Sequence, residues 1–159
     1  MQKITPFLWY DGKAEEAANF YVSVFSTGPS AKNSSITRVM PGPDGNAMGV
    51  DFVLDGQEFI ALNGGPLFKF TEAISLFVKC ETQEEVDHFW NKFTADGGHE
   101  SMCGWLKDKF GLSWQIIPSM LGEMLGDKDR ARAGRAMQAM LQMKKIIIAD
   151  LKKAYGQKS

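Results

Sequence analysis

The sequence contains one amphipathic helix pattern twice, AEEAANFYVSVF at Ala14–Phe25 and QEEVDHFWNKF at Gln83–Phe93. Apolar residues recur in both segments at intervals of three and four, which predicts one buried face on each helix. The aligned residues, at one constant offset, are Glu15, Glu16, Phe20 and Tyr21 in the first segment and Glu84, Glu85, Phe89 and Trp90 in the second. A repeat of this kind indicates that a whole structural module occurs twice.

A second pair of segments supports the same repeat. DGQEFIALN from Asp55 aligns with FGLSWQIIP from Phe110, and the glycines Gly56 and Gly111 coincide. A glycine in a tight turn between two apolar runs is typical of a β-hairpin. Helix and hairpin therefore repeat in the same order.

Each module is expected to have the order βαβββ. The elements expected in the first module are strands at Ile4–Tyr10, Ser35–Met40, Ala47–Leu54 and Glu58–Leu62, with the helix at Ala14–Phe25. Those expected in the second are strands at Ile74–Cys80, Glu100–Met102, Trp105–Lys107 and Leu112–Ile117, with the helix at Gln83–Thr94. The pattern predicts an α+β fold in which two tandem modules form a curved mixed sheet around a cleft.

One domain is expected to span residues 1–159, with module one at 1–70, module two at 71–119 and a C-terminal helix at 120–159. From Asp127 the residues at alternating spacings of four and three form a heptad-like seam. They are Ala133, Met137, Met140, Lys144, Ile147, Leu151 and Ala154. This long helix could cover the cleft, pack on its own domain or contact a second subunit.

Composition and charge exclude several classes of protein. The 159 residues are 44% hydrophobic and 23% charged, and the net charge of −1 gives no field that would attract nucleic acid or an anionic membrane. No run of about 18 apolar residues occurs, and the N-terminus lacks a signal-peptide pattern. We therefore expect a cytoplasmic protein whose partner is a small molecule.

Four sequence blocks in this order resemble one protein family. They are FLWYDGKAEEAANFYVSVF, ALNGGPLFKF, CGWLKDKFGLSWQIIP and MQAMLQMKK. The chain resembles the vicinal oxygen chelate superfamily, which includes glyoxalase I, and within it the PhnB-like branch that is often labelled 3-demethylubiquinone methyltransferase. The resemblance implies the paired-module fold and a homodimer.

The methyltransferase label finds no support in the motifs of the chain. A dinucleotide-type fold that binds S-adenosylmethionine would show a glycine-rich turn between a strand and a helix. The nearest glycine cluster is Asn63-Gly64-Gly65-Pro66. Its proline and the polar and aromatic residues after it indicate a loop and not the start of a helix. We expect no cofactor, and whether the protein is an enzyme stays open.

The metal ligands of the superfamily are also missing at the implied positions. The resemblance places ligands on the first and last strand of each module, and the repeat carries these positions to Pro6 (or its neighbours Thr5 and Phe7), Ile60, Ala73 and Gln115. Only Gln115 can coordinate a metal, whereas such sites need at least three donor side chains. His88 and His99 have no partner at ligand spacing, and both are expected on the surface. We expect no metal site.

Alternating strand residues are expected to line the cleft. On the first strand either Thr5, Phe7 and Trp9 or Pro6, Leu8 and Tyr10 would face it, and the set with Trp9 is favoured. The expected ligand-binding residues are Trp9, Asn63, Phe68, Trp105, Lys107 and Gln115, with Trp114 and Phe70 as further aromatic candidates. Such a pocket suits an aromatic or apolar metabolite held by stacking.

The sequence thus predicts a metal-free protein that binds a small aromatic or apolar metabolite. No Ser-His-Asp set, no Cys-His pair and no carboxylate pair stands out, so catalytic residues are unassigned. Two alternatives remain at this point. The first is a superfamily enzyme, either metal-dependent or the methyltransferase of the label, and the second is a homodimeric interaction module whose cleft is filled by side chains.

Overall fold

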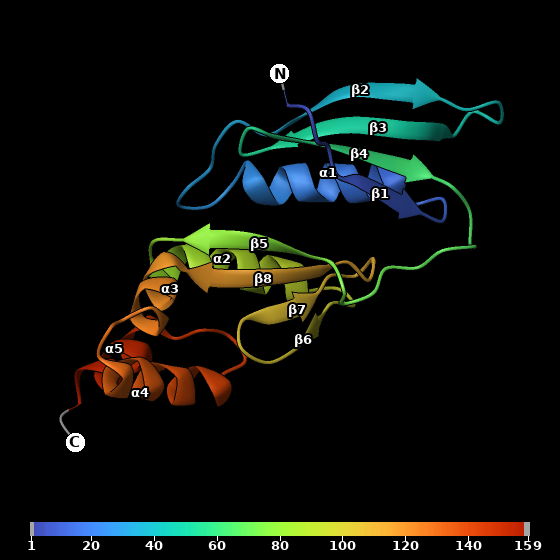
Figure 1. The fold of residues 1–159 in the computed structure, drawn as a ribbon. Coiled ribbons are helices and arrows are strands. Elements are labelled where there is room, and N and C mark those ends of the chain that lie inside the picture. The colour runs from blue at the N-terminus through green and yellow to red at the C-terminus, as the bar shows by residue number, and fades with distance from the viewer. Residues whose placement is uncertain (1, 158–159) are drawn as a thin grey trace. The chain divides into compact units, whose positions relative to one another are not determined.

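The structure, a computed structural model, describes residues 2–157 of the chain. It divides into two compact units, the first ending at Phe70 and the second beginning at Thr71 (Figure 1). Within the described residues there are five helices and eight strands, which form two separate four-stranded sheets. The α+β class predicted from the sequence is confirmed, and neither sheet closes into a barrel.

The first unit is one four-stranded sheet with one helix. Its elements are β1 (Phe7–Tyr10), α1 (Ala14–Phe25), β2 (Ser35–Pro41), β3 (Ala47–Leu54) and β4 (Gln57–Asn63). The strand order is β1-β4-β3-β2, with β1 parallel to β4 and the other pairs antiparallel. A parallel neighbour requires a crossover, and α1 together with two strands provides it.

The core of this unit lies between the sheet and α1. Alternate residues of the strands, among them Leu8, Tyr10 and Phe52, are buried on the helix side. Tyr21 on α1 is fully buried, and its hydroxyl accepts a hydrogen bond from the Tyr10 hydroxyl at 3.0 Å. The strand alternation therefore sends Phe7 and Trp9 to the opposite face of the sheet.

The second unit repeats this arrangement and adds a helical extension. Its elements are β5 (Ser75–Cys80), α2 (Gln83–Thr94), β6 (His99–Glu100), β7 (Trp105–Lys107), β8 (Ser113–Pro118), α3 (Ser119–Leu125), α4 (Arg130–Leu141) and α5 (Ile148–Gly156). The strand order is β5-β8-β7-β6, with β5 parallel to β8. Trp90 and Phe93 of α2 are buried together with Leu106, Trp114 and Ile116 of the sheet.

The internal repeat is confirmed by the geometry of both modules. α1 and α2 each have 12 residues, and each belongs, with two strands, to the crossover between the strands of a parallel pair. The hairpin glycines match as well, because Gly56 and Gly111 have φ angles of +83° and +88°. Positive φ is costly for a residue with a Cβ atom, so the two turns need glycine for the same reason.

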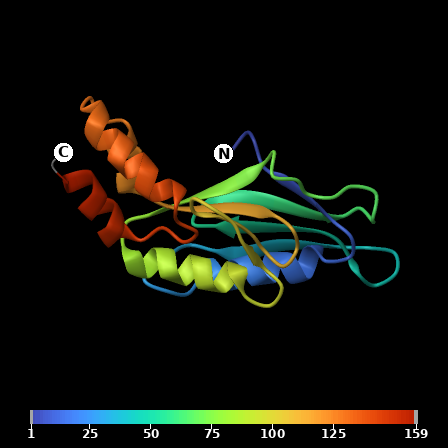
Figure 2. The ribbon, with the colours of Figure 1, turned by 90° about the horizontal axis from the view of Figure 1, so that it is seen from below.

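The prediction of a single long C-terminal helix is wrong. The segment forms three helices, and the predicted helix from Asp127 breaks between Leu141 and Ile148. The heptad seam is not continuous, because Ala133 of α4 and Leu151 of α5 are both buried within this unit. α4 and α5 lie side by side as an antiparallel pair (Figure 2). The last two residues of the predicted helix lie outside the described residues.

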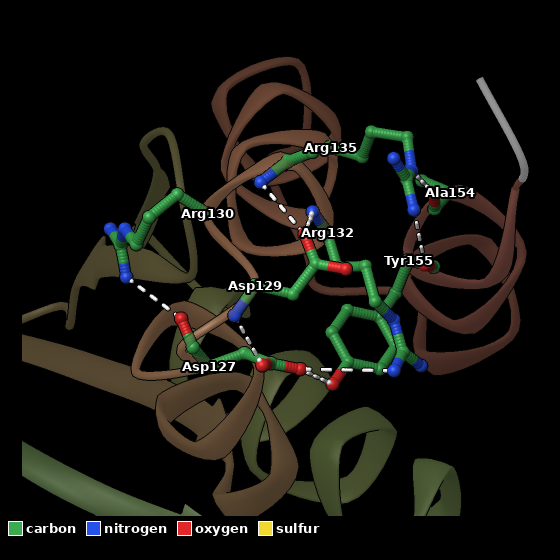
Figure 3. Close-up of polar contacts among 8 residues, drawn as sticks. Asp127, Asp129, Arg130, Arg132, Arg135, Ala154 and Tyr155 are labelled. Carbon is green, nitrogen blue, oxygen red and sulfur yellow. Dashed lines mark hydrogen bonds and ion pairs between the residues drawn. The ribbon is translucent and has the colours of Figure 1, made fainter.

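A polar network holds α4 and α5 together (Figure 3). The Tyr155 hydroxyl donates a short hydrogen bond to the Asp127 carboxylate, and the Arg132 guanidinium lies 4.1 Å from the centre of the Tyr155 ring. This hydrogen bond lowers the pKa of Asp127 and raises the pKa of Tyr155. Arg135 donates to the backbone carbonyls of Ala154 and Tyr155 at 3.1 and 3.2 Å, which satisfies two carbonyls at the end of α5.

The helical extension is bonded directly to the repeated module. The Gln83 side chain at the start of α2 donates to the Ile146 carbonyl at 3.1 Å and accepts from the Ile148 amide at 2.8 Å. In the loop before β7, the Cys103 and Gly104 amides donate to the Met143 and Lys144 carbonyls at 2.7 and 2.8 Å. The extension therefore fixes both one end of α2 and the loop that leads into β7.

A buried aspartate organises the hairpin between β7 and β8. Asp108 is 1% exposed, and its carboxylate accepts hydrogen bonds from the amides of Phe110 and Leu112 at 2.8 and 3.1 Å. The same carboxylate accepts from the Trp114 indole at 2.9 Å. Three donors to one buried carboxylate compensate its loss of hydration.

We expect Asp108→Ala to lower the free energy of unfolding by about 3 kcal/mol, because it removes the acceptor of two buried donors and one part-buried donor. Urea unfolding followed by circular dichroism measures this loss. Asp11→Ala, at an exposed position, is the control and should change the value by less than about 0.5 kcal/mol. A loss at Asp108 as small as that of the control would contradict the role given to the carboxylate.

Candidate functional site

The six residues expected to bind a ligand fall into two groups, one in each unit. In the first unit, Trp9 lies on the sheet face away from α1, because its neighbours Leu8 and Tyr10 are buried under the helix. The Trp9 indole donates to the Gly65 carbonyl at 2.9 Å, and its ring centre is 4.9 Å from that of Phe68 in an edge-on contact. Trp9 and Phe68 are thus brought together.

Asn63 has a structural role in the same unit. Its side-chain oxygen accepts from the Ala14 amide at 2.8 Å, and its side-chain nitrogen donates to the Ala47 carbonyl at 2.8 Å. The first bond satisfies one of the free amides at the start of α1. Both polar groups of Asn63 therefore have backbone partners, which leaves little capacity for a ligand.

In the second unit, Trp105, Lys107 and Gln115 share the sheet face away from α2. The strand register places Trp105 beside Gln115 and Lys107 beside Ser113. Trp114, between Ser113 and Gln115, is buried on the α2 side, so strand alternation turns its two neighbours to the opposite face. We call this the open face of the second sheet.

The open face carries a row of four polar side chains that crosses all four strands. The register joins Ser75 of β5 to Ser113 of β8, Ser113 to Lys107 of β7, and Lys107 to His99 of β6. The adjacent row contains Phe77, Gln115 and Trp105. Polar and aromatic groups therefore lie side by side on one sheet face, as in many small-molecule sites.

A hollow of about 310 Å³ lies at this polar row. We call it the polar hollow, and its lining residues are Glu72, His99, Glu100, Ser101, Trp105, Leu106, Lys107 and Ser113. The volume is at the lower end of the range of ligand pockets. Two of the predicted residues, Trp105 and Lys107, line it, and Gln115 neighbours Trp105 on the same face.

Two polar contacts and one unpaired hydroxyl define the chemistry in and beside the polar hollow. The Lys107 ammonium forms an ion pair with the Glu72 carboxylate, and this hydrogen-bonded partner lowers the pKa of Glu72. The Gln115 side chain donates to the Ser75 hydroxyl at 2.9 Å. The Ser113 hydroxyl is buried and has no hydrogen-bond partner among the described residues. Glu72, Ser75 and Ser113 were not predicted, although Ser113 follows from its alternation with Gln115.

Trp114 does not line a ligand site, so the expectation for this residue is wrong. Its side chain is 1% exposed and stacks on Phe93 with ring centres 4.3 Å apart. Phe70 contacts the helix-side Tyr10 edge-on at 5.2 Å, so it is not on the same face as Trp9. Trp114 contributes to the core of its unit, whereas Phe70 is only half-buried.

The metal-ligand positions implied by the resemblance hold mostly apolar side chains. The register pairs Phe7 with Ile60 in the first unit and Phe77 with Gln115 in the second. Ala73 lies before β5, which begins at Ser75, so the strand partner of Gln115 is Phe77 and not Ala73. Three hydrophobic residues and one amide do not fit a metal ion. Within residues 2–157, no group of three or more histidine, cysteine, aspartate or glutamate side chains is arranged to hold one.

Cys80 is not a nucleophile at neutral pH. Its side chain is fully buried, and this burial, together with the nearby charges of Glu85 and Glu81, raises the pKa of the thiol to about 12. The reactive thiolate is therefore scarce at neutral pH. Cys103 is free as well, so the two cysteines form no disulfide.

Two open-faced βαβββ modules define a protein of the vicinal oxygen chelate superfamily. Within that superfamily, the chain belongs to the family described as 3-demethylubiquinone-9 3-methyltransferase, whose sequence model matches residues 2–117. The matched region ends inside β8, so the helical extension lies beyond it. None of the curated proteins matches the chain significantly.

Solved structures agree with this assignment. A Bacillus cereus PhnB protein, described as a 3-demethylubiquinone-9 3-methyltransferase, is 38% identical, with a TM-score of 0.66 over 74% of this chain and 100% of its own. A Pseudomonas aeruginosa protein is 16% identical, with a TM-score of 0.59 over 74% of this chain and 98% of its own. The fosfomycin resistance protein FosX of Listeria monocytogenes is 14% identical, with a TM-score of 0.54 over 77% and 97%. The last two similarities concern the fold alone.

Along the described part of the chain, no helix has the length and apolar character needed to cross a membrane.

Proposed function

We propose that this protein binds a small aromatic or apolar metabolite on the open face of its second sheet, without a metal ion. The observation that carries the proposal is the polar hollow, in which the Trp105 ring lies beside the polar row of Ser113 and Lys107. An aromatic surface next to a few polar groups suits a flat ligand that has one polar end. Trp9 and Phe68 form a second aromatic surface, in the first unit.

The metal-free state is supported by the side chains at the four strand positions. A hydrophobic residue supplies no lone pair to a cation, so the side-chain oxygen of Gln115 is the single donor at these positions. One FosX structure is described as complexed with Mn(II), but at 14% identity it informs the fold and not the ligands of this chain. A metal-dependent enzyme is therefore the less favoured alternative.

The methyltransferase of the family description is the other alternative. Folds that bind S-adenosylmethionine in the dinucleotide manner have an open, mostly parallel sheet. Each sheet here contains a single parallel pair, and no glycine-rich turn follows β1 or β5. The family description alone favours this activity.

The binding site can be tested with a neutral aromatic probe, 2-naphthamide. We expect its titration to shift the amide resonances of β5, β7 and β8 and to give a saturable binding isotherm. Trp105→Ala should weaken binding about tenfold, because it removes the stacking surface. The control, Phe110→Leu, changes an aromatic residue of the same unit that does not line the hollow and should leave the affinity unchanged. Shifts confined to other elements would contradict the proposed site.

Metal content gives an independent test. After incubation with Zn, Ni, Mn and Fe(II) and removal of free ions, untagged protein should retain far less than one ion per chain by elemental mass spectrometry. The reason is that residues 2–157 contain no group of three or more histidine, cysteine, aspartate or glutamate side chains arranged to hold an ion. Retention of about one ion per chain would make a chelating enzyme the leading hypothesis. Saturable binding of S-adenosylmethionine would instead support the methyltransferase.

We also propose a homodimer to which the helical extension contributes. Met137 and Leu141 of α4 are 39% and 44% exposed and lie one helical turn apart. Apolar side chains that share a helix face are typical of an interface. Sedimentation velocity should give twice the mass of one chain, and the double variant Met137→Glu with Leu141→Glu should give a monomer. A monomeric wild-type protein would contradict the proposal.

A further inference from the structure

The Ser113 hydroxyl in the polar hollow lacks a hydrogen-bond partner. Its residue is 1% exposed, and no described residue accepts from or donates to its oxygen. Buried hydroxyls are rarely left unpaired in folded proteins, because the loss of hydration is then uncompensated. An unpaired hydroxyl that lines a hollow therefore indicates a group that enters the hollow and pairs with it.

The neighbouring charge in the hollow is paired only loosely. Lys107 lies beside Ser113 in the strand register, and its ion pair with Glu72 is formed by side chains that are 41% and 59% exposed. Ion pairs exposed to this degree contribute little stability, so another carboxylate can replace Glu72 at small cost. Glu72 lies outside the strands, between β4 and β5.

The other acidic residue of the hollow, Glu100, has partners of its own. Its carboxylate accepts from the Trp90 indole at 3.0 Å and lies 4.0 Å from the Lys144 ammonium. In the register, Glu100 pairs with Leu106, which is buried on the α2 side. Glu72 is therefore the acidic group whose removal would leave a cation and a hydroxyl donor side by side.

We propose that the ligand of the polar hollow carries a carboxylate or a similar oxyanion, which replaces Glu72 on Lys107 and accepts a hydrogen bond from Ser113. Trp105 then contacts the aromatic or apolar part of the ligand, and His99, next to Lys107 in the polar row, flanks the oxyanion. In the absence of the ligand, Glu72 forms the ion pair with the Lys107 ammonium. This inference rests on the proposed function and specifies its ligand as an aromatic or apolar acid.

The test compares 2-naphthoate with 2-naphthamide, which have the same ring system and differ in charge. Isothermal titration should show that naphthoate binds more tightly to the wild-type protein. Glu72→Gln should tighten naphthoate binding about threefold, because it removes the competing carboxylate, and leave naphthamide unchanged. Lys107→Gln should weaken naphthoate binding about tenfold, because it removes the cation. Ser113→Ala should also weaken naphthoate binding, because it removes the hydrogen-bond donor.

Lys79→Gln is the matched control, because Lys79 lies on the same sheet face beside Ile117 and does not line the hollow. Its naphthoate affinity should equal that of the wild type. Thermal unfolding verifies that each variant is folded, and if Lys107→Gln is not, the exposed Glu72→Gln still provides the decisive comparison.

The outcomes separate this inference from the proposed function. Equal binding of the two probes, with no effect of Glu72→Gln, would overturn the oxyanion inference and leave the aromatic site intact. Binding of neither probe would contradict the proposed function, and the inference with it. Tighter naphthoate binding that responds to Glu72, Lys107 and Ser113 but not to Lys79 would support both.

Discussion

The structure depends on one constraint, namely that each four-stranded sheet has a single helix from the repeat to cover it. A helix buries one face of a sheet, so alternate strand residues such as Tyr10 and Trp114 become core. The strand residues directly before and after such core residues point to the opposite face of the sheet, which the helix does not cover. Phe7 and Phe77 on these faces are 57% and 52% exposed. The repeat that builds the fold therefore also creates the surfaces on which a ligand can bind.

The two modules use these surfaces differently. At the equivalent strand positions, the first unit has Phe7 beside Ile60, whereas the second has Phe77 beside Gln115. The second unit adds Ser113 and Lys107 two residues along the strands, at the next position on the same face. The first surface also carries charge, because Asp51 lies beside Ile60 and forms an ion pair with Arg38. The second places the Trp105 ring beside a cation and an unpaired hydroxyl that line one hollow, and this is the physical reason for placing the ligand's polar end on the second sheet.

Much of the fold could be predicted from the sequence, because periodicity and turn glycines determine it locally. Gln83–Thr94 was predicted with its observed bounds. Trp105 and Gln115, which were both expected to bind a ligand, lie side by side in the strand register. Periodicity could not reveal the break after Leu141, since the apolar spacing continues through it. Nor could it reveal that Asn63 has backbone partners, because those contacts come from distant residues. The role of such a side chain is determined by tertiary hydrogen bonds, which local sequence patterns do not predict.

The helical extension, which the family match does not include, acts on the site through the backbone. Its residues Met143 and Lys144 accept hydrogen bonds from the loop at Cys103 and Gly104, immediately before β7. A Cβ atom at Gly104 would lie 2.6 Å from the Ile117 side chain and 2.9 Å from the Ile116 carbonyl, so this loop is packed tightly against β8. Trp105 follows directly, and its position is therefore fixed from both sides. A binding surface held in place before the ligand arrives loses less conformational entropy on binding, so the extension favours affinity without touching the ligand.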